Sequence, residues 1–172
     1  YAKYSQACQP LVSQTVKTPG VATPQPRTAR YPRDMHRHEL VRWLDDLLNI
    51  RAIPDASLNG LQVEGGTDVN HVAVAVDASK TAIEQAASVG ADFLIVHHGL
   101  FWGGAEPITG MTGARVRLLM ENNISLYAAH LPLDAHPEVG NNWGLAELLG
   151  LDAIEPFAEA SGHPIGARGT FP

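Results

Sequence analysis

The sequence has very little cysteine: Cys8 is the only one among 172 residues. A single thiol excludes an internal disulfide and a zinc site built from several thiolates, and it agrees with a reducing cytosol. No apolar run reaches the roughly 20 residues that a membrane-spanning helix needs. The first residues also lack the basic and apolar stretches of a signal peptide. We therefore expect a cytoplasmic protein with no membrane segment.

Motifs of several common enzyme classes are also missing. No serine stands in a G-x-S-x-G nucleophile elbow. Neither Gly65-Gly66 nor Gly103-Gly104 belongs to a phosphate-cradling Walker loop or to a G-x-G-x-x-G dinucleotide fingerprint. These absences argue against a serine hydrolase, a P-loop nucleotidase and a nicotinamide-dependent dehydrogenase.

Basic residues are scarce after residue 34. Residues 1–34 hold five basic residues against one acid, a net charge of +4, whereas the remainder holds seven against seventeen, a net charge of -10. Such an acidic body cannot offer a broad positive surface to phosphates. Nucleic acid is therefore not an expected partner.

Residues 1–34 also differ in composition from everything after them. Five prolines lie there among serine, threonine, glutamine and glycine, with no sustained apolar period. Such a segment cannot bury enough apolar surface to offset the entropy lost on ordering. We expect a disordered or non-native tail over residues 1–34, with Met35 as a plausible native start, and a domain over residues 35–172.

Regular apolar spacing begins just after Met35. Leu40, Leu44 and Leu48 recur every four residues, which predicts an amphipathic helix over residues 36–49. A loop that contains Asn59 and Gly60 is expected to follow this helix.

Two β-branched segments, 71–77 and 92–97, are typical of buried strands. Between them, Ser79 can cap a helix that runs to about Val89, and Gly90 can end it. A strand, a helix of about ten residues and a second strand make a βαβ unit, so the two strands should be parallel.

A glycine- and proline-rich loop is expected over residues 99–110, followed by a helix over residues 111–122. In that helix the apolar spacing predicts that Leu119 and Met120 face inward.

Residues 124–129 then predict a third strand, and either Asn141 or Asn142 is placed to cap a last helix. The expected fold is a layered α/β domain with βαβ units around a partly parallel sheet. Its functional loops should follow the carboxyl ends of the parallel strands.

The adjacent residues His97 and His98 stand where the second expected strand ends. Neighbouring side chains of a strand face opposite ways, but the backbone can rotate at a strand end that Gly99 follows, so both imidazoles can converge on one cleft. Imidazole is a common metal ligand. The alternative is a pair of hydrogen-bonded loop histidines.

A second cluster, His130, Asp134 and His136, follows the third expected strand. Imidazoles from one loop and a carboxylate from another form a reasonable ligand set for zinc, manganese or iron, and a carboxylate can bridge two cations. The alternative is that Asp134 supports the turn set by Pro132.

Four blocks of the sequence resemble the Nif-three-like family, whose members are often named homologues of type 2 GTP cyclohydrolase I. They are SLNGLQVEG at 57–65, VAVAVDAS at 72–79, GADFLIVHHGLFWGG at 90–104 and SLYAAHLPLDAHPEVGNNWGLAELLG at 125–150. The resemblance begins near Met35 and covers the N-terminal part of the family's pattern, with the blocks in the family's order.

The resemblance implies a Nif-three-like fold with a two-metal centre. It implies that His97 and His98 each bind one metal, and that Asp134 is a carboxylate ligand. It also implies less specific, site-lining roles for three further residues: Asn59, His130 and Asn142. The implied cofactors are two divalent ions per subunit, drawn from zinc, manganese, iron and cobalt.

One departure from the family's pattern bears on the site. The family completes its centre with a C-terminal His-x-x-x-Glu pair, but His163 is followed four residues later by Ala167. We therefore expect a domain that is incomplete at its C-terminus and weakly loaded with metal.

The resemblance leaves three functions open. The first is a hydrolase of the GTP cyclohydrolase type, which would use metal-activated water on a purine nucleotide. The second is a non-catalytic metal-binding interaction or scaffold protein. The third is a two-metal nucleotide phosphohydrolase. A small-molecule substrate and a homo-oligomeric full-length protein are the expected partners.

Overall fold

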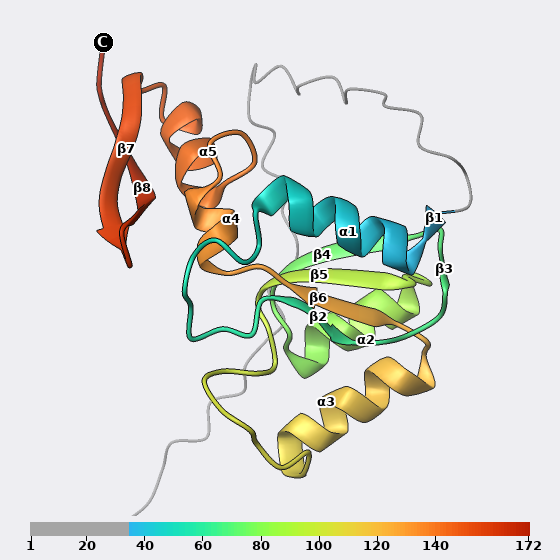
Figure 1. Cartoon of the computed structure of the whole chain (residues 1–172). Coiled ribbons are helices and arrows are strands. Elements are labelled where there is room, and N and C mark those ends of the chain that lie inside the picture. Colours follow the sequence, from blue (N-terminus) through green and yellow to red (C-terminus); the bar gives the residue numbers. More distant parts are fainter. Residues whose placement is uncertain (1–34) are drawn as a thin grey trace, which may run out of the picture. The chain divides into compact units, whose positions relative to one another are not determined.

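The computed structural model describes residues 35–172, so the predicted disordered tail and Cys8 lie outside the described residues. Within this range, the helices are all too short or too polar to cross a membrane. Figure 1 shows the arrangement of the elements.

The first helix, α1, covers Arg37–Leu48, one residue shorter at each end than predicted. It follows a two-residue strand, β1 (Met35–His36), which pairs with β3 (Asp68–Val69). Leu40, Leu44 and Leu48 are buried, because a spacing of four residues places them on one face of the helix. The helix ends at Asn49, whose left-handed backbone (φ of 46°) turns the chain away from the helix axis.

A four-stranded mixed sheet forms the centre of the domain. In spatial order its strands are β2 (Gly60–Val63), β6 (Ser125–Ala128), β5 (Phe93–His98) and β4 (Val72–Asp77). The last three are parallel to one another, and β2 runs antiparallel to β6. The partly parallel α/β fold is therefore confirmed. Strand β2 lies where a loop was predicted, because four residues beginning with glycine give almost no periodic signal.

Helices cover both faces of this sheet (Figure 1). On one face, α1 packs against Phe93, Tyr127 and Ala129. On the other lie α2 (Lys80–Ser88) and α3 (Gly110–Glu121). There Leu94 and Leu126 pack against side chains of both helices. The predicted βαβ unit and its cap are confirmed, because the Ser79 hydroxyl accepts a hydrogen bond of 3.1 Å from the Ala82 amide.

The prediction that residues 71–77 form a buried strand is wrong about burial. Val72, Val74 and Val76 of β4 are 50%, 77% and 63% exposed. Strand β4 is an edge strand of the four-stranded sheet. The side chains that pack against α1 come mainly from β5 and β6, so α1 does not cover Val72, Val74 and Val76 of β4.

Two details of the later helices also differ from the predictions. Met120 is 61% exposed rather than inward, because Leu119 (fully buried) points at the sheet and the next residue lies about 100° further round the helix. Helix α5 (Asn141–Leu148) begins at Asn141, and its N-cap is Gly140 rather than an asparagine.

The chain after β6 contains elements that sequence periodicity did not reveal. A short helix, α4 (Leu131–Ala135), follows β6 directly. After α5, strands β7 (Asp152–Ala160) and β8 (His163–Thr170) form an antiparallel hairpin. The hairpin contacts α4 and α5 through β8.

Candidate metal centre

Five of the six predicted site residues come from one edge of the sheet. His97 and His98 end β5, and His130 and Asp134 follow the end of β6. Because β2 is antiparallel to β6, Asn59, just before β2, lies at the same edge, and Gly60 pairs with Ala128. Strand direction alone therefore gathers residues that are far apart in the sequence.

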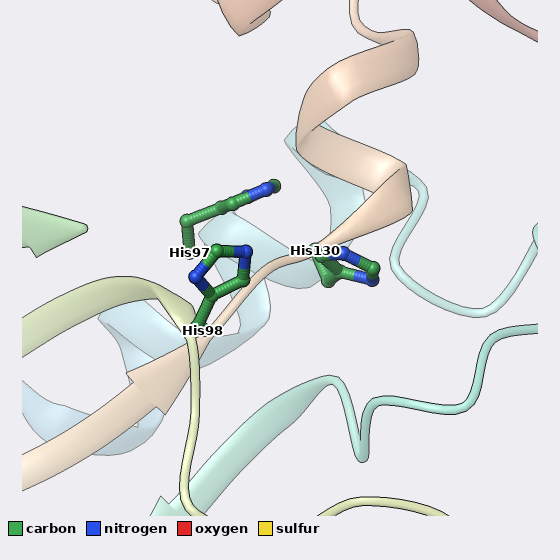
Figure 2. A group of neighbouring side chains, drawn as sticks. All are labelled: His97, His98 and His130. Atoms are coloured by element: carbon green, nitrogen blue, oxygen red, sulfur yellow. The ribbon is translucent and has the colours of Figure 1, made fainter. Parts of the chain in front are cut away.

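Three imidazole rings converge at this edge (Figure 2). His97, His98 and His130 each offer a ring nitrogen within 4.8 Å of the others. Their ring centroids lie 4.5, 4.8 and 5.5 Å apart. The two rings of the adjacent pair thus meet on one side of the strand end, the arrangement that the sequence predicted as one of two alternatives.

Gly99 allows the sheet to be closely packed at this strand end. A Cβ atom there would lie 2.7 Å from the Cβ of Ala128 and would collide with the side chain of Gln62. Gln62 instead uses its Oε1 to accept a 2.7 Å hydrogen bond from the Leu100 amide. A side chain at position 99 would therefore displace the segment that carries the paired histidines.

Each of the three rings is held through its Nδ1 atom. His97 Nδ1 donates to the carbonyl oxygen of Ala129 at 3.0 Å. His98 Nδ1 lies 2.6 Å from a carboxylate oxygen of Asp77, and His130 Nδ1 lies 3.0 Å from both oxygens of Asp55. Carbonyl and carboxylate oxygens accept hydrogen bonds, so the proton belongs on Nδ1 and the lone pair on Nε2. This is the tautomer in which a neutral imidazole binds a metal through Nε2.

Asp55 is a buried, ionised carboxylate that holds several groups together. Its side chain is 3% exposed. Burial alone would raise its pKa, but hydrogen bonds from Asn59, His130 and the amides of Ser57 and Leu131 outweigh burial and lower the pKa to about 2. The Asn59 side chain also accepts a 2.8 Å hydrogen bond from the His130 amide. Asn59 therefore holds the backbone of His130 in place.

Asp134 lies beside the histidine cluster on the side of His97. Its Oδ2 is 3.6 Å from His97 Nε2, and the two side chains are 18% and 16% exposed. This distance is too long for a hydrogen bond, but it is close to the roughly 3.3 Å that separates two ligand atoms on one tetrahedral zinc ion. Asn141 donates to the other carboxylate oxygen at 3.1 Å and so orients it.

Two other residues from the sequence analysis lie differently. Asn142 donates to the carbonyl oxygen of Ile165 in β8, so it ties the hairpin to the rest of the site region. His136 accepts hydrogen bonds at its Nδ1 from the amides of Glu138 and Val139. That ring therefore stabilises a turn, and it is not part of the three-histidine cluster.

The chemistry of the assembled groups fits a divalent transition metal. Three imidazoles and a neighbouring carboxylate suit zinc, manganese, iron and cobalt alike. His97, His98, His130 and Asp134 are the residues that could hold such an ion. His130, which the sequence pattern placed in a candidate ligand set and the family resemblance placed in a site-lining role, belongs to the same cluster as the paired histidines.

Sequence reasoning did not single out Asp55, Asp77 or Asn141 as functional. Asp77 had a usable signal, because it ends the predicted strand 71–77, which was expected to run parallel to the strand that ends at His97. In the structure Asp77 is paired in register with His98. Asp55 had none: it lies 75 residues from His130, and only the folded chain brings them together.

These observations define an α/β protein with a histidine-rich candidate metal site at the carboxyl edge of its sheet. The model of one family, Duf34/NIF3 (NGG1p interacting factor 3), matches residues 35–172. The chain belongs to this family, as the sequence resemblance implied.

Curated relatives share much of the sequence. A GTP cyclohydrolase 1 type 2 homolog of Deinococcus radiodurans is 49% identical over 87% of this chain and 56% of its own length. A protein of the same name from Pyrococcus horikoshii is 55% identical over 80% of this chain and 55% of its own length. The chain thus spans about half the length of these relatives.

Solved structures agree with the fold. The crystal structure of TTHA1606 from Thermus thermophilus gives a TM-score of 0.70 at 55% identity, over 72% of this chain and 51% of that chain. Reduced HcgD from Methanocaldococcus jannaschii gives 0.65 at 30% identity, over 73% of this chain and 51% of that chain.

Proposed function

We propose that this chain is a divalent-metal-binding protein whose centre is built on His97, His98, His130 and Asp134. One observation carries the proposal. Three imidazoles from two strand ends offer nitrogens within 4.8 Å of one another, and the Nδ1 atom of every ring is bound to an oxygen acceptor. These acceptors favour a proton on Nδ1, which leaves the Nε2 lone pair of each neutral imidazole available to a metal.

In this proposal the protein's own groups have separate roles. His97 and His98 bind metal through Nε2, and Asp134 supplies negative charge and an oxygen ligand beside His97. His130 completes the cluster from the end of the neighbouring strand β6. A bound divalent ion supplies Lewis acidity, which activates water for hydrolysis.

For the whole protein, we propose hydrolysis of a purine nucleotide ring, a reaction of the GTP cyclohydrolase type. The support is the name of the curated relatives together with a candidate metal-binding residue set. A non-catalytic role is the second candidate, because the family description refers to an interacting factor. Hydrolysis of nucleotide phosphates at a two-metal site is the third.

Metal binding is tested by titrating the metal-free chain with Zn²⁺ and by elemental analysis of the loaded protein. We expect His98→Ala to weaken Zn²⁺ binding at least 10-fold. His71→Ala is the matched control, because His71 also lies near a carboxylate, 3.7 Å from Asp92, and is 72% exposed outside the cluster. Equal binding by wild type and His98→Ala would refute the proposed centre.

The three candidate functions can be distinguished by the products that they release or do not release. With metal-loaded protein and GTP, a cyclohydrolase releases formate, whereas a phosphohydrolase releases phosphate. Release of either product should depend on added metal and should be lost in His98→Ala. A metal-loaded full-length relative that releases neither product would favour the interaction role.

A further inference from the structure

Two carboxylates lie behind the histidine cluster and contact it only through Nδ1 atoms. Asp77 accepts from His98, and Asp55 accepts from His130. We propose that Asp77 and Asp55 are positioning residues of the metal centre, each fixing the tautomer and orientation of one imidazole so that Nε2 is the metal-binding atom. This inference rests on the proposed metal-binding function.

The imidazoles need such a partner because either ring nitrogen can carry the proton. In a neutral histidine the proton's place is set by the hydrogen bond that the other nitrogen makes. For His97 a backbone group fixes the tautomer: the carbonyl oxygen of Ala129 can only accept, so Nδ1 carries the proton. The rings of His98 and His130 depend on side chains instead.

Asp77 makes its side-chain contact with His98, on the exposed end of β4. Its side chain is 63% exposed and makes a short 2.6 Å contact with His98. It stands opposite His98 in the register of the parallel pair β4 and β5. We infer from this short contact that Asp77 orients the ring of His98.

Asp55 combines positioning with a structural role. Its two oxygens accept from the His130 ring, the Leu131 amide and the Asn59 side chain. It thereby fixes the loop before β2 against the junction between β6 and α4. Because its substitution would also loosen that junction, Asp77 offers the cleaner test.

The test uses the full chain and three variants: Asp77→Ala, Asp77→Asn and Asp68→Ala. Asp77→Asn keeps an acceptor oxygen at the same position. Asp68→Ala is the matched control, since Asp68 is 65% exposed and contacts His36 at 3.1 Å outside the cluster. Histidine tautomers are read from ¹⁵N NMR of the metal-free protein. Zn²⁺ affinity is then measured by calorimetry.

We expect Asp77→Ala to move His98 away from the Nδ1–H tautomer, leave His97 unchanged, and raise the Zn²⁺ dissociation constant about 10- to 100-fold. Asp77→Asn should restore part of both losses, and Asp68→Ala should match wild type. An unchanged His98 tautomer in Asp77→Ala would overturn the positioning role. If the tautomer were unchanged but Zn²⁺ binding were lost, Asp77 would be a direct ligand instead. Failure of wild type to bind Zn²⁺ would instead refute the proposed function, and the NMR result would still decide whether Asp77 orients the ring.

Discussion

Tyr127 places a phenol hydroxyl inside the domain, on the α1 face of the sheet. The residue is fully buried, and its hydroxyl donates a 2.8 Å hydrogen bond to Asp45 of α1. Burial, together with the hydrogen bond to and repulsion by the Asp45 carboxylate, raises the pKa of Tyr127 well above its ordinary value of 10.0. The neutral phenol therefore joins the first helix to the central strand β6.

Replacing Tyr127 with Phe should lower the free energy of unfolding by about 1 to 1.5 kcal/mol near neutral pH, because a buried hydrogen bond is lost. The pH dependence has a definite sign. The folded-state pKa is raised, so this contribution is fully present below pH 10 and is lost as the pH rises above it. Urea unfolding from pH 7 to 11 tests both effects.

A double-mutant cycle with Asp45→Asn provides the control. If the hydrogen bond is responsible, the two substitutions together should cost less than the sum of their separate effects. Strict additivity, or a wild type that gains stability relative to Tyr127→Phe above pH 10, would contradict this account.

At the scale of elements, the start of α2 shows how local chemistry sets a junction near the site. Strand β4 ends at Asp77, and Ser79 caps α2 two residues later. The cap satisfies one of the amides that the first turn of a helix leaves without a partner. It also fixes where the chain turns away from the edge that carries Asp77 and His98.

The Ser79→Ala variant should lose about 1 kcal/mol of unfolding free energy, as is usual for a lost N-cap. The matched control is Ser88→Ala, the same substitution in the last turn of α2, where the hydroxyl is exposed and donates to a carbonyl oxygen. Chemical unfolding followed by circular dichroism gives both values. Equal effects of the two substitutions would show that capping contributes nothing specific here.

At the scale of the whole molecule, the edge of the sheet at β4 is the most exposed apolar feature of a strand in the described chain. Val72, Val74 and Val76 point outward on the α1 face, and the outer side of β4 pairs with no described strand. Unpaired strand edges with apolar side chains and no lysine or proline are templates for association.

We therefore expect Val74→Lys to reduce self-association of the chain without loss of stability. Val89→Lys is the control, because Val89 is similarly exposed (71%) but lies at the end of α2. Light scattering over a range of protein concentrations measures the difference. Equal scattering by the two lysine variants would place association elsewhere on the molecule.

The elements with strong local signals could be predicted from the sequence alone. Helix α1, the βαβ unit and strand β6 follow from apolar spacing and from the cap at Ser79, which depend on neighbours a few residues away. Strand β2 and the β7–β8 hairpin have no such signal. The exposure of the β4 valines could not be predicted from the sequence, because it depends on how far α1 extends across the sheet.

The residues of the candidate centre also fall into two groups, those that the sequence indicated and those that only the structure revealed. His97 and His98 at a strand end, and Asp134 in the block that resembles the family, were visible in the sequence by themselves, as was the likeness to the Nif-three-like family. His130 was also a candidate ligand in the sequence, but only the tertiary structure showed that it lies within reach of His97 and His98, and that Asp77 and Asp55 contact the Nδ1 atoms of His98 and His130. The physical reason is that these contacts join residues 21 to 75 positions apart, and their distances are fixed by strand order and register, not by local spacing.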